Sequence, residues 1–243
     1  LRAVIRCRQW AGRIARGDHQ DGTGMEVLER AGFQRRFIES FLRPFFGGVF
    51  LDETLSVSAD RFLRVMHRFA HGSAELPHGG MQQLAEAMAA PIDGCITFGC
   101  EVDSIEPGKG VRDTDGHLHE ARQIVLATPW DVTACLLGRE DLVASSNWSG
   151  TAAVHFRSSQ PVTREPLIHL NGSGRGSLNL VFSPSSVAPG YLADGTHSVL
   201  ASLRPYRGQP SKIHPSQIQD EAGEILGVSS ADWEFVEAIG VPR

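Results

Sequence analysis

The sequence lacks a membrane-length apolar run, a secretory signal pattern and an excess of basic residues. A transmembrane helix needs roughly 18 or more apolar residues in a row, and no stretch approaches that length. The net charge of −5 argues against a nucleic-acid partner, which normally requires a basic balance. We therefore expect a cytoplasmic protein that binds no nucleic acid.

Cysteine is scarce, and several catalytic signatures are missing. The four cysteines, Cys7, Cys95, Cys100 and Cys135, form no C-x-x-C pair, so reduced thiols are the simplest account. No G-x-S-x-G nucleophile element is present, which leaves hydrolase chemistry without support. The G-x-G-x-x-G turn of dinucleotide-binding proteins is also absent.

What the sequence does contain is an ordered change of periodicity. With 243 residues, 41% of them hydrophobic, the chain can bury a sizeable core as one large or two small domains. Apolar residues at helical spacing mark 1–16, 25–31, 33–46, 58–70 and a helix that opens at Gly80. Strand-like runs mark 95–105, 123–127, 152–156, 167–170, 178–182, 198–203 and 233–239, with a helix at 217–226. The pattern predicts an α+β fold with a largely antiparallel second half.

Helix ends are signalled by capping residues and glycines. Thr23 and Glu26 are spaced as a capping box, and Gly32 suits a left-handed stop. We expect Pro44 and the pair Gly47-Gly48 to break the aromatic helix of 33–46.

The first helix, 1–16, carries five arginines among its apolar residues. It could lie on a membrane surface. Its modest apolar content favours a helix that packs on the core and exposes a charged face.

Three short sequence motifs follow one another in an order that indicates a family. Residues 77–84 read P-x-G-G-M-x-x-L, residues 101–105 read E-V-D-S-I, and residues 124–129 read I-V-L-A-T-P. In that order and spacing the chain resembles the middle of the FAD-dependent oxidoreductases that include flavin amine oxidases, protoporphyrinogen oxidase and phytoene desaturases. The resemblance implies part of a FAD/NAD(P)-binding-like fold, joined to a helical segment and an antiparallel substrate-domain sheet.

The same resemblance implies where FAD would bind. Val102 stands where the family contacts the adenine through its main chain. Gly79 and Gly80 form the turn before the helix, where backbone can approach an anion. Thr128 and Pro129 end the strand that re-enters the flavin domain. The resemblance assigns no catalytic residue, because the flavin ring itself accepts the hydride.

Two features bear on the substrate. The stretch 41–51, FLRPFFGGVFL, is similar to one in phytoene-desaturase-like members, and it could form an apolar pocket wall or an ordinary packed helix. The amine-oxidase branch commonly places a lysine near the flavin, whereas here only Lys109 and Lys212 occur, both in predicted loops. We expect an apolar or amine-type substrate and an oxidoreductase of the desaturase-like or of an uncharacterised kind.

The resemblance also predicts domain organisation. We expect 1–75 to be the helical part of a substrate domain, 76–130 the middle of the FAD-binding domain and 131–243 the substrate-domain sheet. The chain begins at Leu1 within a predicted helix and ends directly after a predicted strand, so we expect an internal fragment. The alternative hypothesis is a non-catalytic fragment that acts as a binding or interaction module.

A fragment of this kind would expose apolar surface where the rest of the flavin domain docks. We expect that surface to include some of Ile96, Ile105, Ile124 and Leu126. Peripheral membrane contact and homo-oligomer formation are kept open for the same reason.

Two further motifs have ordinary structural explanations. His67 and His71 stand at metal-ligand spacing with Glu75 and His78 nearby, but Arg68 occupies the place where a zincin motif needs Glu. We therefore predict no metal site. The glycine-rich run 172–177 lacks the Lys-Ser/Thr ending of a phosphate loop, so a hairpin turn is expected.

Overall fold

The computed structural model describes residues 2–143, 148–163, 165–192, 194–206 and 208–241. The chain forms two compact units: unit 1 comprises Leu1–Gln83 with Ser149–Arg243, and unit 2 is Leu84–Trp148. Leu1, Pro242 and Arg243 lie outside the described residues. The assignment of the stretches 1–75, 76–130 and 131–243 to substrate and cofactor domains stays a prediction.

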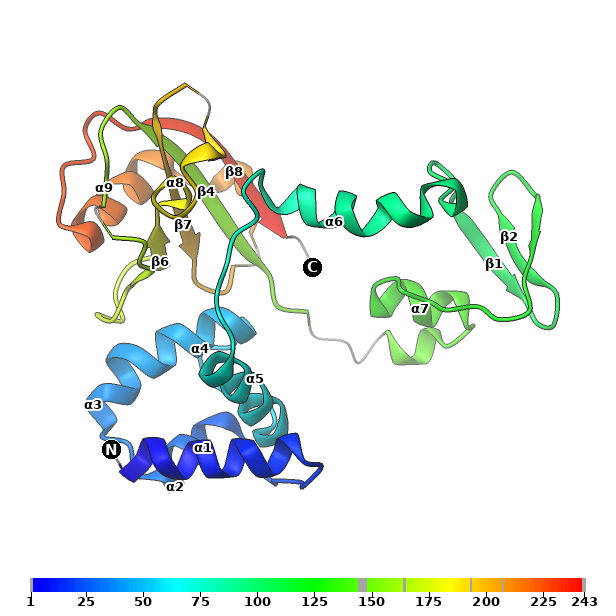
Figure 1. The fold of residues 1–243 in the computed structure, drawn as a ribbon, viewed down its shortest axis with the longest axis horizontal. Coiled ribbons are helices and arrows are strands. Elements are labelled where there is room, and N and C mark those ends of the chain that lie inside the picture. The colour runs from blue at the N-terminus through cyan, green and yellow to red at the C-terminus, as the bar shows by residue number, and fades with distance from the viewer. Residues whose placement is uncertain (1, 144–147, 164, 193, 207, 242–243) are drawn as a thin grey trace. The chain divides into compact units, whose positions relative to one another are not determined.

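The elements follow the predicted order of helices first and sheet later, as Figure 1 shows. The helices are α1 (Arg2–Ala15), α2 (Gly24–Ala31), α3 (Arg35–Phe37), the π-helix η1 (Ile38–Leu42), α4 (Arg43–Phe50), α5 (Ala59–His71), α6 (Met81–Ala89), η2 (Ala90–Cys95), α7 (Trp130–Leu136), η3 (Glu140–Leu142), α8 (Pro184–Val187), η4 (Pro189–Tyr191), η5 (Pro210–Lys212) and α9 (Pro215–Leu226). The strands are β1 (Val102–Glu106), β2 (Gly110–Asp113), β3 (Leu118–Glu120), β4 (Thr151–Ser158), β5 (His169–Leu170), β6 (Leu178–Phe182), β7 (His197–Leu203) and β8 (Glu234–Val241).

The helices of unit 1 enclose the first of its two cores. Phe62 and Leu63 of α5 are fully buried there, and α1 contributes Cys7, Ala11 and Ile14 from one face. Burying a large apolar side chain stabilises a fold by about 1.5–3 kcal/mol. The core-packed interpretation of the first helix is therefore confirmed, and its arginines lie on the outer side. Membrane contact stays a prediction.

The predicted capping of α2 is present in full. The Thr23 side chain accepts a hydrogen bond from the Glu26 N–H at 3.3 Å, and the Glu26 carboxylate accepts one from the Thr23 N–H at 3.1 Å. Gly32 ends the helix with φ of 83°, and its N–H donates to the Leu28 and Glu29 carbonyls. This geometry is the reciprocal satisfaction that the sequence predicts.

The predicted break at Pro44 and Gly47-Gly48 is wrong. The helix continues through these residues to Phe50, because the wider π-helical turn η1 comes directly before Pro44. In η1 the Arg43 N–H donates to the Ile38 carbonyl five residues back, so the backbone has widened where a proline ring would otherwise clash. Gly48 serves close packing, because a Cβ there would overlap the side-chain amide of Asn179 on β6.

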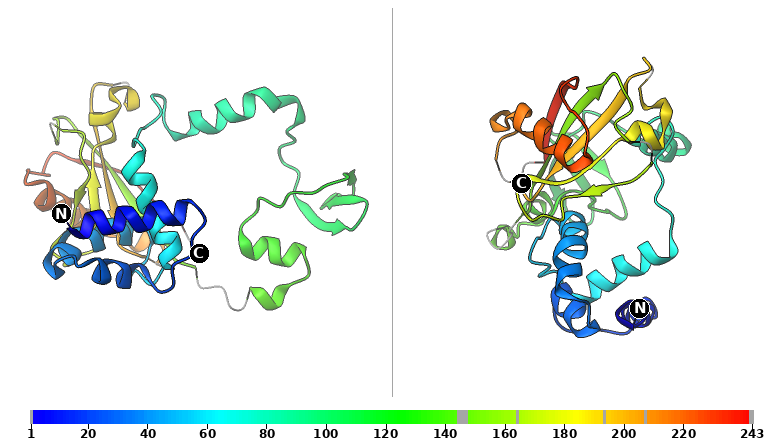
Figure 2. Two further views of the ribbon diagram at one scale, coloured as in Figure 1. Left: turned by 60° about the horizontal axis from the view of Figure 1, so that its bottom comes forward. Right: turned by 90° about the vertical axis from the view of Figure 1, so that its left-hand side faces the viewer.

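The second core of unit 1 lies under an antiparallel sheet of order β5-β6-β7-β4-β8. Along β4 the burial alternates strictly, so that Ala152, Val154 and Phe156 face inward. Helix α9 packs against β4, β5 and β6 through Ile218 and Ala222, which Figure 2 lets the reader follow. The predicted antiparallel second half, with its helix near 217–226, is confirmed.

Unit 2 contains a separate antiparallel sheet of order β1-β2-β3. The strand predicted for 95–105 begins only at Val102, because Cys95 ends the 3₁₀-helix η2. The strand predicted for 123–127 is not formed, since no neighbouring strand among the described residues pairs with its backbone, and Val125 is 89% exposed. Apolar composition alone therefore overstated both strands.

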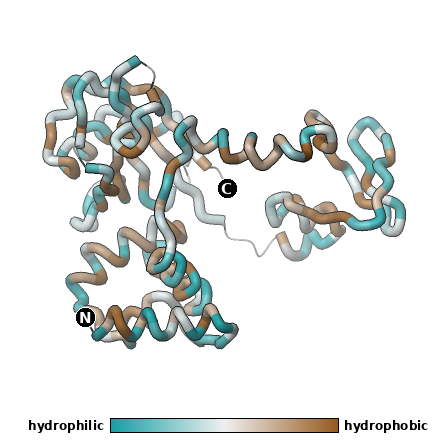
Figure 3. Tube along the Cα trace, viewed as in Figure 1, coloured by the Kyte–Doolittle hydropathy of each residue, from teal (hydrophilic) through white to brown (hydrophobic). Residues whose placement is uncertain are grey.

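Unit 2 has almost no core of its own. Among its described residues Ala134 is the only buried hydrophobic side chain, whereas many large apolar ones are exposed. The exposed set comprises Leu84, Met88, Ile92, Phe98, Ile124, Val125, Trp130, Val132, Leu137 and Trp148. Figure 3 shows apolar stretches along this unit in brown. Of the four residues predicted to be exposed, Ile124 is exposed at 38%, and Ile96, Ile105 and Leu126 are partly buried.

None of the described helices combines the length and the apolar character that a membrane crossing requires.

Substituting Gly172→Ala should destabilise unit 1. A Cβ at Gly172, in the β5–β6 turn, would overlap the backbone carbonyl oxygen of Ser40 in η1, which cannot rotate away. Overpacking of this kind typically costs about 1–3 kcal/mol. Chemical denaturation measures the loss. Gly12→Ala is the control, because its Cβ meets only an ordinary 3.6 Å contact on α1 and should stabilise the helix. Equal stability of G172A and the parent would show that the turn does not abut η1.

Candidate functional site

The five residues predicted to bind a cofactor fall in both units. Val102, Thr128 and Pro129 belong to unit 2, and Gly79 and Gly80 belong to unit 1. Within unit 2, α7 packs against β1, so the elements that carry Val102 and Pro129 are in contact. Their role in binding stays a prediction.

Val102 begins β1, which is an edge strand. It pairs with Asp113 of β2, and an irregularity in the register follows before Ser104. Because β1 has a strand on one side only among the described residues, alternate main-chain groups face away from the sheet and can bond a ligand. A main-chain contact with an adenine ring is compatible with this placement of half-buried Val102. The residues around Val102 therefore fit the group that the resemblance implies.

Thr128 and Pro129 form the entry to α7. Pro129 precedes the helix with φ of −53° and ψ of 152°, and its carbonyl accepts a hydrogen bond from the Thr133 N–H at 2.8 Å. The hydroxyls of Thr128 and Thr133 lie 2.7 Å apart. This local network fixes the start of α7 without a strand before it.

Gly79 and Gly80 form a hydrogen-bonded turn before α6. Gly80 adopts φ of 92°, and its N–H donates to the Pro77 carbonyl at 3.0 Å. The Gly79 N–H donates to the side-chain oxygen of Gln83 at 3.1 Å. Glycine at 80 is required by the left-handed backbone. Both N–H groups already donate to protein acceptors, so an anion that bound here would have to displace those acceptors.

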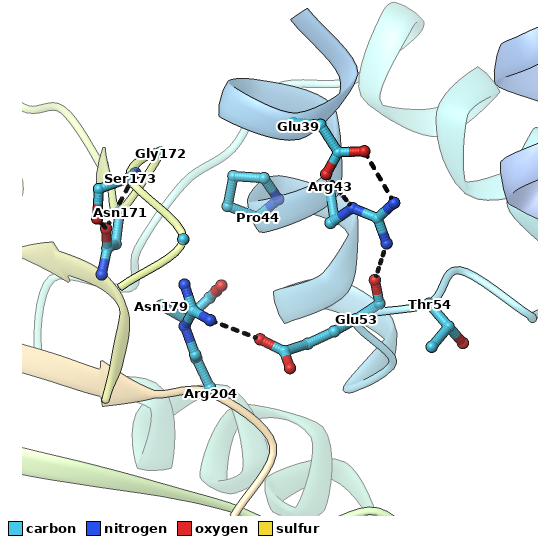
Figure 4. A pocket seen from close by; sticks show the side chains of 11 residues that line it. Glu39, Arg43, Pro44, Glu53, Thr54, Asn171, Gly172, Ser173, Asn179 and Arg204 are labelled. Atoms are coloured by element: carbon cyan, nitrogen blue, oxygen red, sulfur yellow. Dashed lines mark hydrogen bonds and ion pairs between the residues drawn. The ribbon is translucent and has the colours of Figure 1, made fainter. Parts of the chain in front are cut away.

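A polar pocket of about 440 Å³ lies within unit 1, between η1–α4 and the sheet (Figure 4). Arg43 donates from Nε and Nη2 to the Glu39 carboxylate, at 2.7 and 3.1 Å, and from Nη1 to the Glu53 carbonyl at 2.5 Å. Arg204 lies 3.4 Å from the Glu53 carboxylate. Two arginines and two glutamates thus pair with one another, which leaves no excess charge on this wall. The pKa of Glu39 is lowered, chiefly by its hydrogen bond from Arg43.

Two asparagines complete the pocket. The Asn171 amide donates to the Arg175 and Leu178 carbonyls, at 2.6 and 2.9 Å, and its oxygen accepts from the Ser173 N–H. These bonds hold 172–177 as the β5–β6 hairpin turn, so that prediction is confirmed. Asn179 is buried, with 6% of its surface exposed, and its Nδ2 has no hydrogen-bond partner among the described residues.

The aromatic stretch 41–51 does not line this pocket, apart from Arg43 and Pro44. Phe46 is buried in the helical core, where its ring lies 4.6 Å from that of Phe62. Phe41 is 44% exposed. Phe46 therefore follows the helix-packing interpretation, whereas Phe41 and Val49 are exposed, and the pocket-wall interpretation of this stretch stays a prediction. The pocket residues from the sheet could not be found by sequence reasoning, because only the fold brings Asn179 and Arg204 to Glu53.

His67 and His71 lie one helical turn apart on α5, with their rings in contact. Their ring centroids are 4.2 Å apart, and His71 Nδ1 lies 2.9 Å from the His67 carbonyl oxygen. Neither belongs to a group of three or more metal-ligating side chains among the described residues.

A family model described as flavin containing amine oxidoreductase matches residues 8–233 of the chain. The chain belongs to this family. Its match covers both units and includes the runs at 77–84, 101–105 and 124–129. The predicted membership of the flavin amine oxidase superfamily is therefore confirmed. Among curated proteins no sequence relative matches.

Three solved structures share the fold. An oxidoreductase from Methanosarcina mazei is 15% identical with a TM-score of 0.72 over 94% of this chain and 58% of its own. A protein from Pyrococcus furiosus is 17% identical with a TM-score of 0.74, over 95% and 60%. A putrescine oxidase double mutant is 14% identical with a TM-score of 0.68, over 97% and 59%. At these identities the likeness shows the α+β, FAD-binding-like fold alone, and the chain spans about 60% of the length of these structures.

The carboxyl of Glu39 should titrate below the usual value of 4.5 in the folded protein. Because the pKa of Glu39 is lower in the folded than in the unfolded protein, its pair with Arg43 stabilises the fold at pH values above the unfolded pKa. This stabilisation is lost as the pH falls through the folded pKa. The pair is partly exposed, so its contribution is no more than about 1 kcal/mol. Side-chain carboxyl NMR measures the midpoint. Arg43→Gln should raise it, and Arg204→Gln, which does not touch Glu39, should leave it unchanged. A midpoint indifferent to R43Q would contradict the assignment.

Proposed function

We propose that the chain is part of a FAD-dependent oxidoreductase that transfers a hydride from its substrate to the flavin. The observation that carries the proposal is the family match over residues 8–233, because flavin is the group that this family contains. FAD, when bound, supplies the hydride acceptor. The free edge of β1 offers main-chain groups to which an adenine can bond, which is compatible with FAD as the form of flavin.

In this proposal the protein's residues bind and orient the cofactor. The main chain of Val102 bonds the adenine, and the turn at Thr128 and Pro129 leads into α7, which packs against the same strand. Gly79 and Gly80 allow the backbone before α6 to adopt its tight turn. No side chain of the chain is given an acid or base role.

We propose an apolar or amine-type substrate, with a desaturase-like chemistry. The placement of the two lysines supports the second part. Lys109 is in the β1–β2 turn, where it pairs with Glu106 at 3.3 Å, and Lys212 ends the short helix η5. Lys109 lines a shallow surface pocket beside Leu118 and Arg122, but neither lysine lies on a strand, which is where the amine-oxidase branch would need it.

The competing proposal is a non-catalytic binding or interaction module, and the apolar surface of unit 2 favours it. Large exposed apolar patches usually mark an interface. We propose that further polypeptide covers this surface, or that copies of the chain associate through it. Sedimentation of the chain as a monomer at every concentration would contradict association.

Peripheral membrane contact is a separate proposal, which concerns exposed apolar side chains of α1 in unit 1, such as Val4 and Ile5.

FAD binding by the 243-residue chain tests the proposed function. We expect the protein to purify without flavin, because the glycine turn for the pyrophosphate is missing from this sequence. Added FAD should bind weakly but saturably. Val102→Ala should change this affinity little, since the contact is backbone, and Val102→Pro should abolish it by removing the N–H. Quenching of flavin fluorescence measures both.

Circular dichroism of the proline variant serves as the control for loss of β1 itself. Equal weakening by V102A and V102P would place the contact in the side chain. No saturable binding of FAD by the parent chain would favour the interaction module, and stoichiometric FAD on purification would contradict the predicted weak site.

A further inference from the structure

Three metal-ligating side chains converge in unit 2 on one face of the small sheet. They are Cys100 just before β1, Asp113 at the end of β2 and His119 on β3. Cys100 Sγ lies 3.5 Å from His119 Nε2 and 3.7 Å from Asp113 Oδ2, and Nε2 lies 2.8 Å from Oδ2. All three ligand atoms are within 4.8 Å of one another.

The way the histidine is used argues against a nucleophilic triad. In such a triad one ring nitrogen faces the nucleophile and the other faces the carboxylate. Here the same atom, His119 Nε2, faces both Cys100 Sγ and Asp113 Oδ2. Three potential ligands that point at a common centre are the arrangement of a metal site.

The spacing of the three atoms suits a tetrahedral ion. Zinc bonds of about 2.3 Å to sulfur and about 2.0 Å to nitrogen or oxygen put sulfur about 3.5 Å from either other ligand. The two sulfur distances observed, 3.5 and 3.7 Å, already match this. His119 Nε2 and Asp113 Oδ2 are closer, at 2.8 Å, because the imidazole and the carboxylate hydrogen-bond directly. Moving these two atoms apart by about half an ångström would make room for the ion.

The backbone holds the ligands in this arrangement. Thr114 N–H donates to the Glu101 carbonyl at 3.0 Å, which keeps the residues next to Asp113 and Cys100 side by side. The other carboxylate oxygen of Asp113 accepts the His117 N–H at 2.8 Å, so Oδ2 is left to face the cluster. Asp113 is 8% exposed, whereas the His119 side chain is 47% exposed, which gives an ion a path from solvent. An outer hydrogen bond that orients a ligand is typical of built metal sites.

We propose that Cys100, Asp113 and His119 bind a zinc ion, with the fourth position filled by water. Thiolate and imidazole ligands select zinc over magnesium or calcium. His117 Nδ1 lies 3.5 Å from Asp113 Oδ2, but it does not belong to the mutually close set. The ion would link the strands of a unit that has almost no apolar core, and a bound metal commonly stabilises small folds of that kind. This proposal departs from the sequence-based expectation that the chain has no metal site.

Titration of the reduced 243-residue chain with Co²⁺ tests the proposal. Cobalt in a thiolate site gives a sulfur-to-metal charge-transfer band in the near ultraviolet. We expect one band that saturates at one ion per chain and disappears when Zn²⁺ is added. Cys100→Ser should abolish the band, and Asp113→Asn and His119→Gln should each weaken binding at least about 100-fold, more than the loss of an outer partner costs.

The controls use the neighbouring cysteines and histidine. Cys95→Ser and Cys135→Ser remove exposed thiols of the same unit and should leave the band unchanged, as should His117→Gln. The far-ultraviolet circular dichroism of each metal-free variant should match the parent, and if C100S fails this check the D113N and H119Q affinities decide. A chain without the band, a band that survives C100S, or a band lost with C95S would overturn the proposal.

Discussion

The structure depends first on where apolar side chains are buried. In unit 1, Phe62 and Leu63 centre the helical core, and Val154 and Phe156 centre the core beneath the sheet. Unit 2 buries only Ala134 among its described hydrophobic residues. Because burial is the main favourable term in folding, the two units differ in what holds them. Unit 1 is stabilised by its own cores. Unit 2 is held by backbone pairing and local ion pairs, and its apolar side chains remain exposed.

The parts of the fold that sequence predicts are those fixed locally. The capping box at Thr23 and Glu26 and the alternation along β4 depend on neighbours in the chain, and both are found. The π-helical turn before Pro44 was not predictable, because proline and paired glycines ordinarily end a helix. The strand predicted at 123–127 is not formed, because a strand also needs a neighbouring strand to pair with, and the local sequence does not show whether one is there.

The candidate sites divide along the same line. Val102 could be proposed only through family resemblance, because a main-chain contact leaves no mark on the side chain. The pocket beside Arg43 depends on Asn179 and Arg204, which the sheet supplies. Cys100 lies 13 residues from Asp113, and no spacing rule connects it to His119, so their convergence follows from strand register alone.

Hydrogen exchange of the full chain tests the central claim that unit 2 lacks a core of its own. Amides in the cores of unit 1, such as Phe62 on α5 and Val154 on β4, should exchange slowly through near-global unfolding. Amides of β1 to β3 in unit 2 should exchange much faster, with a lower free energy of opening. Equal protection of the two units, in the chain alone and without added metal or flavin, would contradict the account.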